Sequence, residues 1–227
     1  IIKFTKKIAI TNKESIICGW SLIKKSLLKY NTKFYPVDSE HFSIWELIDK
    51  NLKNSKFLKK VYITASGGPF YNKNIDLNKI KIVDAINHPN WDMGKKISID
   101  SATMMNKIFE LIEAHKIFDI EYNNIKILFH PKSYVHSIVK FKNGTIKILC
   151  HETTMTIPII NSLFDPLNLD YKTKDVNFKI LNSLNFSIKN NLNSFPLLNL
   201  VKLLQNKESL YETVLVTVND FFVFKFL

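Results

Sequence analysis

The chain has 227 residues, 46% of them hydrophobic, and a formal net charge of +12 at pH 7. This length suits one large domain or two small ones around a buried core. No apolar run approaches the roughly 20 residues that a membrane-spanning helix needs, so we expect no membrane partner. Two cysteines do not make a disulfide framework, and a reducing compartment is the expected setting.

All 32 basic residues are lysine, and arginine is absent from the sequence. A nucleic-acid-binding protein would cluster its positive charge and often use arginine. Compact basic clusters occur only at 56–60 and 93–96. Lysine, asparagine and isoleucine recur from end to end, which is typical of AT-rich coding sequence. We therefore expect a generally basic surface and no nucleic-acid partner, with a basic nucleic-acid-binding module as the less favoured alternative.

The first 65 residues alternate between strand-like and helix-like segments. Short apolar runs predict strands, and apolar residues at helical spacing predict helices. The expected elements are a strand at 6–10, a helix at 15–30, a strand at 32–37, a helix at 41–50 and a strand at 59–65. This order predicts an α/β (α+β) fold with a mainly parallel sheet, in which ligands bind beyond the carboxyl ends of the strands.

One long helix is expected at 101–118, with Ser101 as its N-cap. Its apolar side would face the core. Its other side carries Thr103, Asn106, Lys107 and Glu110, at spacings that place them on one helical face. A polar helical face of this kind is usually exposed to solvent. The varied donors and acceptors of this one also suit a binding site, and the pattern does not decide between the two alternatives.

A β-hairpin is expected after this helix, because Asn143–Gly144 is typical of a type I′ turn. The remaining expected elements are a strand at 124–130, strands at 137–142 and 145–150, a polar linker near 165–192, and helices at 196–205 and 212–225.

Three carboxylates would form a site if the fold brought them together. Asp38 and Glu40 follow the strand expected at 32–37, and Glu110 lies on the polar side of the long helix. Carboxylates in one pocket repel each other unless a cation is present, and hard oxygen ligands suit Mg²⁺ or Mn²⁺ better than Zn²⁺. By itself, an Asp-x-Glu spacing is a weak signal.

A second set of polar residues has the chemistry of an anion site. Hydroxyls, an amide, an ammonium group and a helix N-terminus together favour phosphate. The residues concerned are Ser66, His88, Ser101, Asn106 and Lys107. Gly67 and Gly68 would let the backbone approach a ligand closely, or would simply form a tight turn. Taken alone, His88 is more often a structural histidine and Trp91 more often a core residue.

Six motifs occur in order along the chain. They are "NKES" (12–15), "PVDSEH" (36–41), "SGGPF" (66–70), "HPNWDMGKKISIDSATMMNK" (88–107), "HPKSYVHS" (130–137) and "TVLVTVND" (213–220). Together they closely resemble the 1-deoxy-D-xylulose 5-phosphate reductoisomerase family of non-mevalonate isoprenoid biosynthesis. The resemblance covers nearly the whole chain, and the central motif is long and specific.

The resemblance implies an enzyme that isomerises 1-deoxy-D-xylulose 5-phosphate and reduces the product with NADPH to 2-C-methyl-D-erythritol 4-phosphate. It implies Mg²⁺, Mn²⁺ or Co²⁺ as the metal, a sugar phosphate as the substrate and a homodimer as the assembly. AT-rich coding suggests the cytoplasm of a bacterium or endosymbiont, or the stroma of a plastid such as the apicoplast.

The resemblance also assigns roles by position. It implies metal ligands at Asp38, Glu40 and Glu110, and catalytic groups at Lys13, Glu40, His88 and Glu110. It implies substrate contacts at Lys13, Ser39, Glu40, Ser66, His88, Ser101, Asn106, Lys107 and Glu110. It implies NADPH contacts at Asn12, Glu14 and Gly94, and flap or wall positions at Trp91, Met93, His136 and Met155.

The family's domain plan implies four segments. We expect the end of an NADPH-binding domain at 1–14, a catalytic domain at 15–165, a linker at 166–192 and an incomplete C-terminal helical domain at 193–227. Five glycines, none in a dinucleotide-binding arrangement, lead us to expect that these residues alone do not cradle NADPH.

Some positions depart from the family pattern. Ile108 stands where the family usually has glycine, and the stretch 151–158 lacks the usual Pro-Asp before Met155. A branched side chain at position 108 could push the helix away from its neighbour. An alternative reading is therefore a drifted, non-catalytic remnant that binds metal and sugar phosphate.

Overall fold

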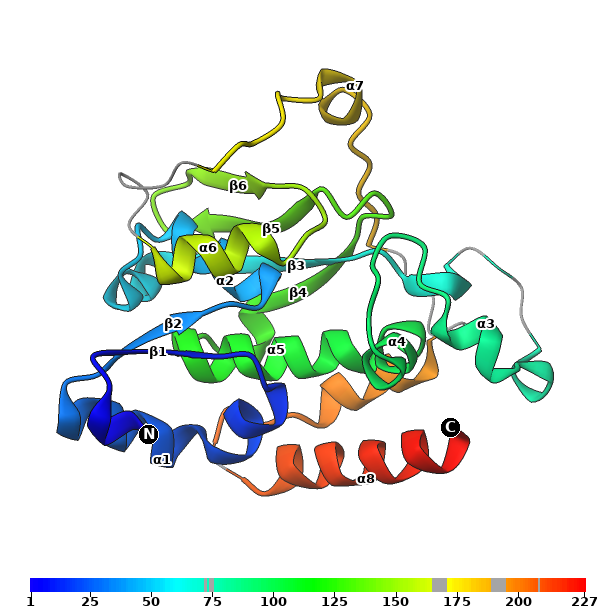
Figure 1. Cartoon of the computed structure of the whole chain (residues 1–227), viewed down its shortest axis with the longest axis horizontal. Coiled ribbons are helices and arrows are strands. Elements are labelled where there is room, and N and C mark those ends of the chain that lie inside the picture. Colours follow the sequence, from blue (N-terminus) through cyan, green and yellow to red (C-terminus); the bar gives the residue numbers. More distant parts are fainter. Residues whose placement is uncertain (72, 74–75, 165–170, 189–194, 208) are drawn as a thin grey trace.

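The computed structural model describes residues 1–71, 73, 76–164, 171–188, 195–207 and 209–227 (Figure 1). The strands are β1 (Lys7–Ile10), β2 (Lys33–Pro36), β3 (Leu58–Ala65), β4 (Ile125–Phe129), β5 (Val135–Phe141) and β6 (Ile146–Cys150). The α-helices are α1 (Lys13–Tyr30), α2 (Ser39–Leu47), α3 (Ile82–Ile86), α4 (Lys95–Ala102), α5 (Met105–Phe118), α6 (Thr156–Leu163), α7 (Phe178–Leu181) and α8 (Tyr211–Phe226). Short 3₁₀-helices include η3 (Gly68–Phe70) and η7 (Pro196–Leu203).

The strands form two sheets, and the mixed α/β class expected from the sequence is confirmed. β1 and β2 make a two-stranded parallel sheet, while the larger sheet has the order β4-β3-β5-β6. The expectation of a mainly parallel sheet is wrong for the larger one, because only β3 and β4 run parallel there. Parallel neighbours need a long crossover, and only short loops precede β5 and β6, so these strands run antiparallel to their partners.

The expected hairpin joins β5 to β6, but its turn is not type I′. That type needs positive φ at both central residues. Here Gly144 has φ +92°, whereas Asn143 is not among the described residues with positive φ. The Gly144 N–H donates to the Phe141 carbonyl at 3.1 Å, and the Asn143 side chain accepts from the Thr145 N–H at 3.0 Å. These features fit a type I turn followed by a left-handed glycine.

The helix expected at 101–118 is two helices separated by a sharp break. α4 ends at Ala102, and the Thr103 hydroxyl donates back to the Ile99 carbonyl at 3.0 Å. Met104 then takes a left-handed conformation, with φ of +65°, before α5 begins. The proposed N-cap role of Ser101 is therefore wrong, since this residue lies in the last turn of α4. No glycine or proline marks the break in the sequence.

One further helical expectation needs correction, because the segment expected as an α-helix at 196–205 is the 3₁₀-helix η7. Helices α3, α6 and α7 have no counterpart among the expected elements. The helix expected at 212–225 is α8. Parts of the linker expected at 165–192 lie outside the described residues. Among the described helices, none is long and apolar enough to cross a membrane.

Helix α5 lies at the centre of the fold. It packs against β3 and β4 of the larger sheet and against α1, and α8 packs against α1 and α4 (Figure 1). Phe109 and Ile112 of α5 meet Val61 and Ile63 of β3 in one core cluster, and all four are at most 1% exposed. Burying such side chains contributes about 1.5–3 kcal/mol each. Ile108 is also fully buried there, so its branched side chain is accommodated within the core.

Candidate metal and anion site

Parallel pairing brings Lys13 and Asp38 to one edge of the smaller sheet. Ile10 of β1 pairs with Pro36 of β2, so the residues that follow both strands leave the sheet side by side. Lys13 begins α1, and Asp38 caps α2 by accepting a hydrogen bond from the Glu40 N–H at 3.1 Å. The two carboxylates therefore lie just beyond the strand end, Asp38 as the N-cap of α2 and Glu40 in its first turn.

The larger sheet places a second set of polar groups at an equivalent edge. Ala65 at the end of β3 pairs with Phe129 at the end of β4, and β5 begins near the same edge. Ser66 follows β3 directly, and His136 is the second residue of β5. Helix α5 approaches this edge with its N-terminal residues.

Asp38, Glu40 and Glu110 converge in the structure. Each offers a carboxylate oxygen, and these oxygens all lie within 4.8 Å of one another. Glu110 is 2% exposed and Glu40 is 8% exposed. The polar side of α5 is thus buried against this cluster, and the solvated-face alternative is wrong for Lys107 and Glu110.

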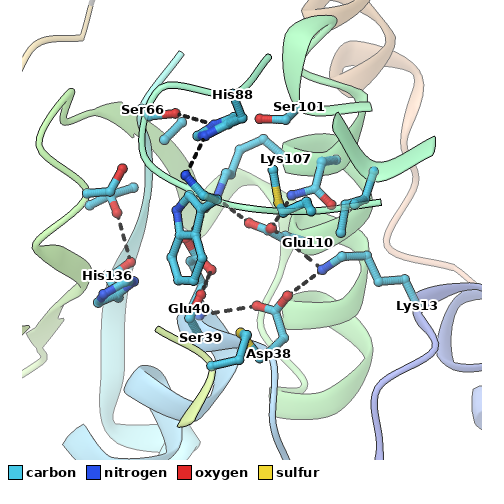
Figure 2. Close-up of a pocket in the computed structure, with 18 of the residues that line it drawn as sticks. Lys13, Asp38, Ser39, Glu40, Ser66, His88, Ser101, Lys107, Glu110 and His136 are labelled. Carbon is cyan, nitrogen blue, oxygen red and sulfur yellow. Dashed lines mark hydrogen bonds and ion pairs between the residues drawn. The ribbon is translucent and has the colours of Figure 1, made fainter. Parts of the chain in front are cut away.

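Two buried lysines lie among the carboxylates (Figure 2). The Lys13 Nζ pairs closely with Asp38 and lies 3.5 Å from Glu110. The Lys107 Nζ pairs closely with Glu110 and lies 3.0 Å from Glu40. Burial works to lower the pKa of each lysine, but the neighbouring carboxylates outweigh it and raise both pKa values above the usual range. Both side chains therefore carry a charge near neutral pH.

The same field divides the three carboxylates. Burial opposes ionisation of Asp38 and Glu40, but Lys13 beside the first and Lys107 beside the second hold each pKa below its usual range. Burial and the adjacent Glu40 charge raise the pKa of Glu110 to about 7. Among these three carboxylates, Glu110 is therefore the one whose ionisation is opposed by burial and nearby negative charge more than it is favoured by the lysines.

The charge balance fits a divalent cation. A fourth buried carboxylate, Glu113, lies 3.3 Å from the Lys13 Nζ. Burial raises the pKa of Glu113 as well as that of Glu110. When all four carboxylates are ionised, they and the two ammonium groups leave two negative charges, which one Mg²⁺ or Mn²⁺ would balance. The donors are oxygen atoms, which these cations prefer.

Sequence reasoning missed Glu113 and His41. The His41 Nδ1 lies 3.3 Å from Asp38 and 3.9 Å from Glu113, and its Nε2 lies 2.8 Å from the Glu110 carbonyl. Asp38, His41 and Glu113 form a second group with ligand atoms within 4.8 Å of one another. Glu113 follows Glu110 by three residues, so helical spacing could have indicated it.

The anion-type donors line the same cavity as the carboxylates. Its volume is about 230 Å³. The lining includes Lys13, Asp38, Ser39, Glu40, Ser66, His88, Trp91, Met93, Ser101, Asn106, Lys107, Glu110, His136 and Met155. Ser39 donates to Glu40 at 2.6 Å, and the Asn106 amide donates to Glu110 at 2.6 Å. The structure thus brings fourteen of the seventeen expected site residues to one cavity.

Hydrogen bonds to His88 fix the tautomer of its ring, and this in turn fixes the direction in which the Ser66 hydroxyl can donate. The His88 Nδ1 accepts from the backbone N–H groups of Asn90 at 3.1 Å and Trp91 at 3.0 Å. Burial, followed by the Lys107 charge, lowers the pKa of His88 to about 4, so the ring is neutral and its proton is on Nε2. Nε2 then donates to the Ser66 Oγ at 3.1 Å, and the Gly68 N–H donates to the same oxygen at 3.0 Å. The Ser66 hydroxyl hydrogen is left to donate elsewhere.

Gly67 and Gly68 form a tight turn with positive φ at both positions. A Cβ at Gly68 would lie 3.1 Å from the Ser101 carbonyl oxygen, so the close approach that glycine permits here is to α4. The turn therefore holds Ser66 and Ser101 on neighbouring parts of the cavity wall.

The remaining three expected residues lie outside this cavity. Asn12, Glu14 and Gly94 line an adjoining depression, which shares Lys13 and Asn106 with the cavity. Asn12 also caps α1 by accepting from the Ser15 N–H at 2.7 Å. These residues therefore border the site without entering it.

Fold and cavity define an α/β protein with buried carboxylates and anion-type donors in one site. The family model for the 1-deoxy-D-xylulose 5-phosphate reductoisomerase C-terminal domain matches residues 34–118. The resemblance that the motifs indicate is confirmed, because the chain is similar to 1-deoxy-D-xylulose 5-phosphate reductoisomerases along its whole length.

The individual comparisons agree with each other. The Pelagibacter ubique reductoisomerase is 57% identical over 100% of this chain and 58% of its own length. The Clostridium acetobutylicum reductoisomerase is 39% identical with the same coverage. A crystal structure of DOX-P reductoisomerase with NADPH, fosmidomycin and magnesium has a TM-score of 0.89 at 35% identity, covering 99% of this chain and 57% of that one. The Zymomonas mobilis enzyme with NADPH has a TM-score of 0.87 at 32% identity and the same coverage. The chain thus spans under three fifths of the length of these relatives.

Proposed function

We propose that this chain forms the metal- and substrate-binding part of a 1-deoxy-D-xylulose 5-phosphate reductoisomerase. The observation that carries the proposal is a single cavity lined by both the carboxylate cluster and the phosphate-type donors. The similarity to bacterial reductoisomerases supports it. The proposed enzyme isomerises the sugar phosphate to a branched aldehyde and reduces that aldehyde with NADPH to 2-C-methyl-D-erythritol 4-phosphate.

Asp38, Glu40 and Glu110 are the proposed ligands of Mg²⁺, Mn²⁺ or Co²⁺. When bound, the cation would polarise substrate oxygens and stabilise developing negative charge. Lys13 and Ser39 lie beside these carboxylates and are the proposed contacts to the sugar's polar groups. Among these groups, the proposed catalytic ones are Lys13, Glu40, His88 and Glu110.

Ser66, Ser101, Asn106 and Lys107 are the proposed phosphate donors. The Ser66 hydroxyl hydrogen is directed away from His88 by the hydrogen bonds described above, and a phosphate oxygen is a suitable acceptor for it. The charged Lys107 adds a charge-assisted contact, which is stronger than a neutral hydrogen bond.

Trp91 and Met93 are the proposed flap over the substrate, and His136 and Met155 its walls. The Trp91 and His136 rings meet edge to face, with centroids 6.2 Å apart. The neighbouring Asn90 amide donates to the Pro131 carbonyl at 2.7 Å, which holds this segment against the loop before β5. A closed segment of this kind would exclude water from the reacting centre.

NADPH is the proposed cofactor, with Asn12, Glu14 and Gly94 as its contacts in the adjoining depression. Two of the solved relatives are described as complexes with NADPH, and one of these also contains fosmidomycin and magnesium. Because the depression adjoins the cavity, a nicotinamide there would lie next to the substrate.

The proposed domain plan assigns 1–14 to the cofactor side, 15–165 to metal and substrate binding, 166–192 to a linker and 193–227 to a helical region. The proposed assembly is a homodimer. The proposed location is the bacterial cytoplasm, with a plastid stroma as the alternative.

The test is an NADPH oxidation assay on the natural protein that carries this sequence. With 1-deoxy-D-xylulose 5-phosphate and Mn²⁺ we expect substrate-dependent loss of NADPH absorbance that stops when EDTA is added. Tight binding of Mn²⁺ and phosphate without any turnover would instead support the non-catalytic remnant.

A further inference from the structure

Outside the cavity, the Lys96 side chain joins three helices. Its Nζ lies 2.7 Å from a carboxylate oxygen of Glu14 on α1, 3.1 Å from Asp100 on α4 and 3.1 Å from Asp220 on α8. Asn219 of α8 donates to the other oxygen of Asp100 at 2.8 Å. We call these five residues the Lys96 cluster.

The Lys96 cluster depends on its single cation. Asp100 is 3% exposed, and burial raises its pKa despite the contacts from Asn219 and Lys96. Without the Lys96 charge, the buried Asp100 would face Glu14 and Asp220 with no cation between them. Like charges in such surroundings repel, so α4 would be pushed away from α1 and α8.

The helix held in this way carries part of the candidate site. α4 follows Gly94 at the end of the segment that contains Trp91, and its last turn carries Ser101. Glu14, at the other end of the ion pair, is adjacent to Lys13 in the first turn of α1. Lys96 is absent from the lining of the metal and anion cavity, but it lines the adjoining depression together with Glu14 and Asp100.

We propose that Lys96 is a positioning residue: it fixes α4 against α1 and α8, and thereby sets Ser101 and the Trp91 segment relative to Lys13. The claim that Lys96 affects the reaction rests on the proposed function. The claim that Lys96 holds α4 in place rests only on the ion pairs. Helix α8 contributes no residue to the cavity lining. Under this proposal it still helps to form the site, because Asp220 anchors Lys96.

The first experiment compares Lys96→Met with Lys95→Met. Both changes remove one positive charge from the first turn of α4, but Lys95 is exposed and makes none of the three ion pairs. We expect Lys96→Met to weaken binding of inorganic phosphate about tenfold by calorimetry and to speed amide hydrogen exchange across 95–102 by a similar factor, because coupled charges in one network have effects of this size. We expect Lys95→Met to change either quantity by less than about twofold, the size usual for an exposed charge.

A second variant separates positioning from simple stability. In Lys96→Met, the additional change Asp220→Asn removes one of the repelling carboxylates, so we expect it to restore phosphate affinity to within about threefold of the wild type. All measurements are made where circular dichroism shows each variant folded. Equal effects of the two lysine changes, or a Lys96→Met protein with a lower melting temperature but unchanged phosphate affinity and exchange, would overturn the inference. If the wild type itself does not bind phosphate, the proposed anion site fails, and the exchange comparison still decides whether Lys96 holds α4.

Discussion

Replacing Glu110 with glutamine is expected to weaken Mn²⁺ binding by about a hundredfold or more, since even loss of an outer-shell partner typically costs 10- to 100-fold. Glutamine keeps the shape of the side chain but removes its charge from the cluster. The matched control is Glu113→Gln, a buried glutamate one turn further along α5 that contacts Lys13 and not Glu40. We expect this control to lose about tenfold or less.

The two glutamates distinguish the two overlapping ligand groups of the cluster. If the cation instead binds Asp38, His41 and Glu113, the control becomes the severe variant and Glu110→Gln the mild one. Titration calorimetry at pH 8 on folded protein measures both. A mild effect at Glu110 would exclude this residue as a ligand.

The raised pKa of Glu110 leads us to expect that metal binding depends on pH. Its pKa is raised to about 7, so below that pH a proton competes with the cation for the same carboxylate. Apparent Mn²⁺ affinity should therefore rise with pH up to about 7 and level off above it, with nearly one proton released per cation bound below that point. Glu110→Gln should lose this step. An unchanged pH profile in that variant would assign the titration to another group.

Replacing Lys107 with methionine is expected to weaken phosphate binding by roughly 10- to 150-fold, because charge-assisted hydrogen bonds contribute about 1.5–3 kcal/mol. The same change removes the ammonium group that lowers the pKa of Glu110, so that pKa should move further above 7. Mn²⁺ affinity at pH 7 should consequently fall as well, and should recover partly at pH 8.5.

Lys116→Met is the matched control, because Lys116 lies on the same helix α5 and is not part of the cavity lining. Its phosphate and Mn²⁺ affinities should stay within about twofold of the wild type. If Lys107→Met binds phosphate as the wild type does, the ammonium group has no place in the anion site, and its role would be limited to neutralising Glu40 and Glu110.

The residue chemistry of the site was predictable where it depended on local order. Carboxylates placed just after a strand end, and the polar residues Asn106, Lys107 and Glu110 on one side of α5, do meet in the cavity. The end of a strand and the periodicity of a helix can both be read from local sequence. The convergence itself depends on Ile10 pairing with Pro36 and on the approach of α5, which the pattern alone does not specify.

Other features depended on tertiary contacts that leave little trace in the sequence. The break at Met104 has no glycine or proline to signal it, and it moves Ser101 from a helix start to a helix end. The direction of β5 follows from the short connection after β4 rather than from its composition. Glu113 and His41 were missed because each has an ordinary local setting and becomes informative only beside Lys13 and Asp38.

The most direct test is the position of a bound cation, measured by anomalous diffraction from crystals grown with Mn²⁺. We predict a single strong peak coordinated by Asp38, Glu40 and Glu110 within the cavity that also contains Lys107. A peak at Asp38, His41 and Glu113, or no peak within the carboxylate cluster at saturating Mn²⁺ and pH 8, would contradict it.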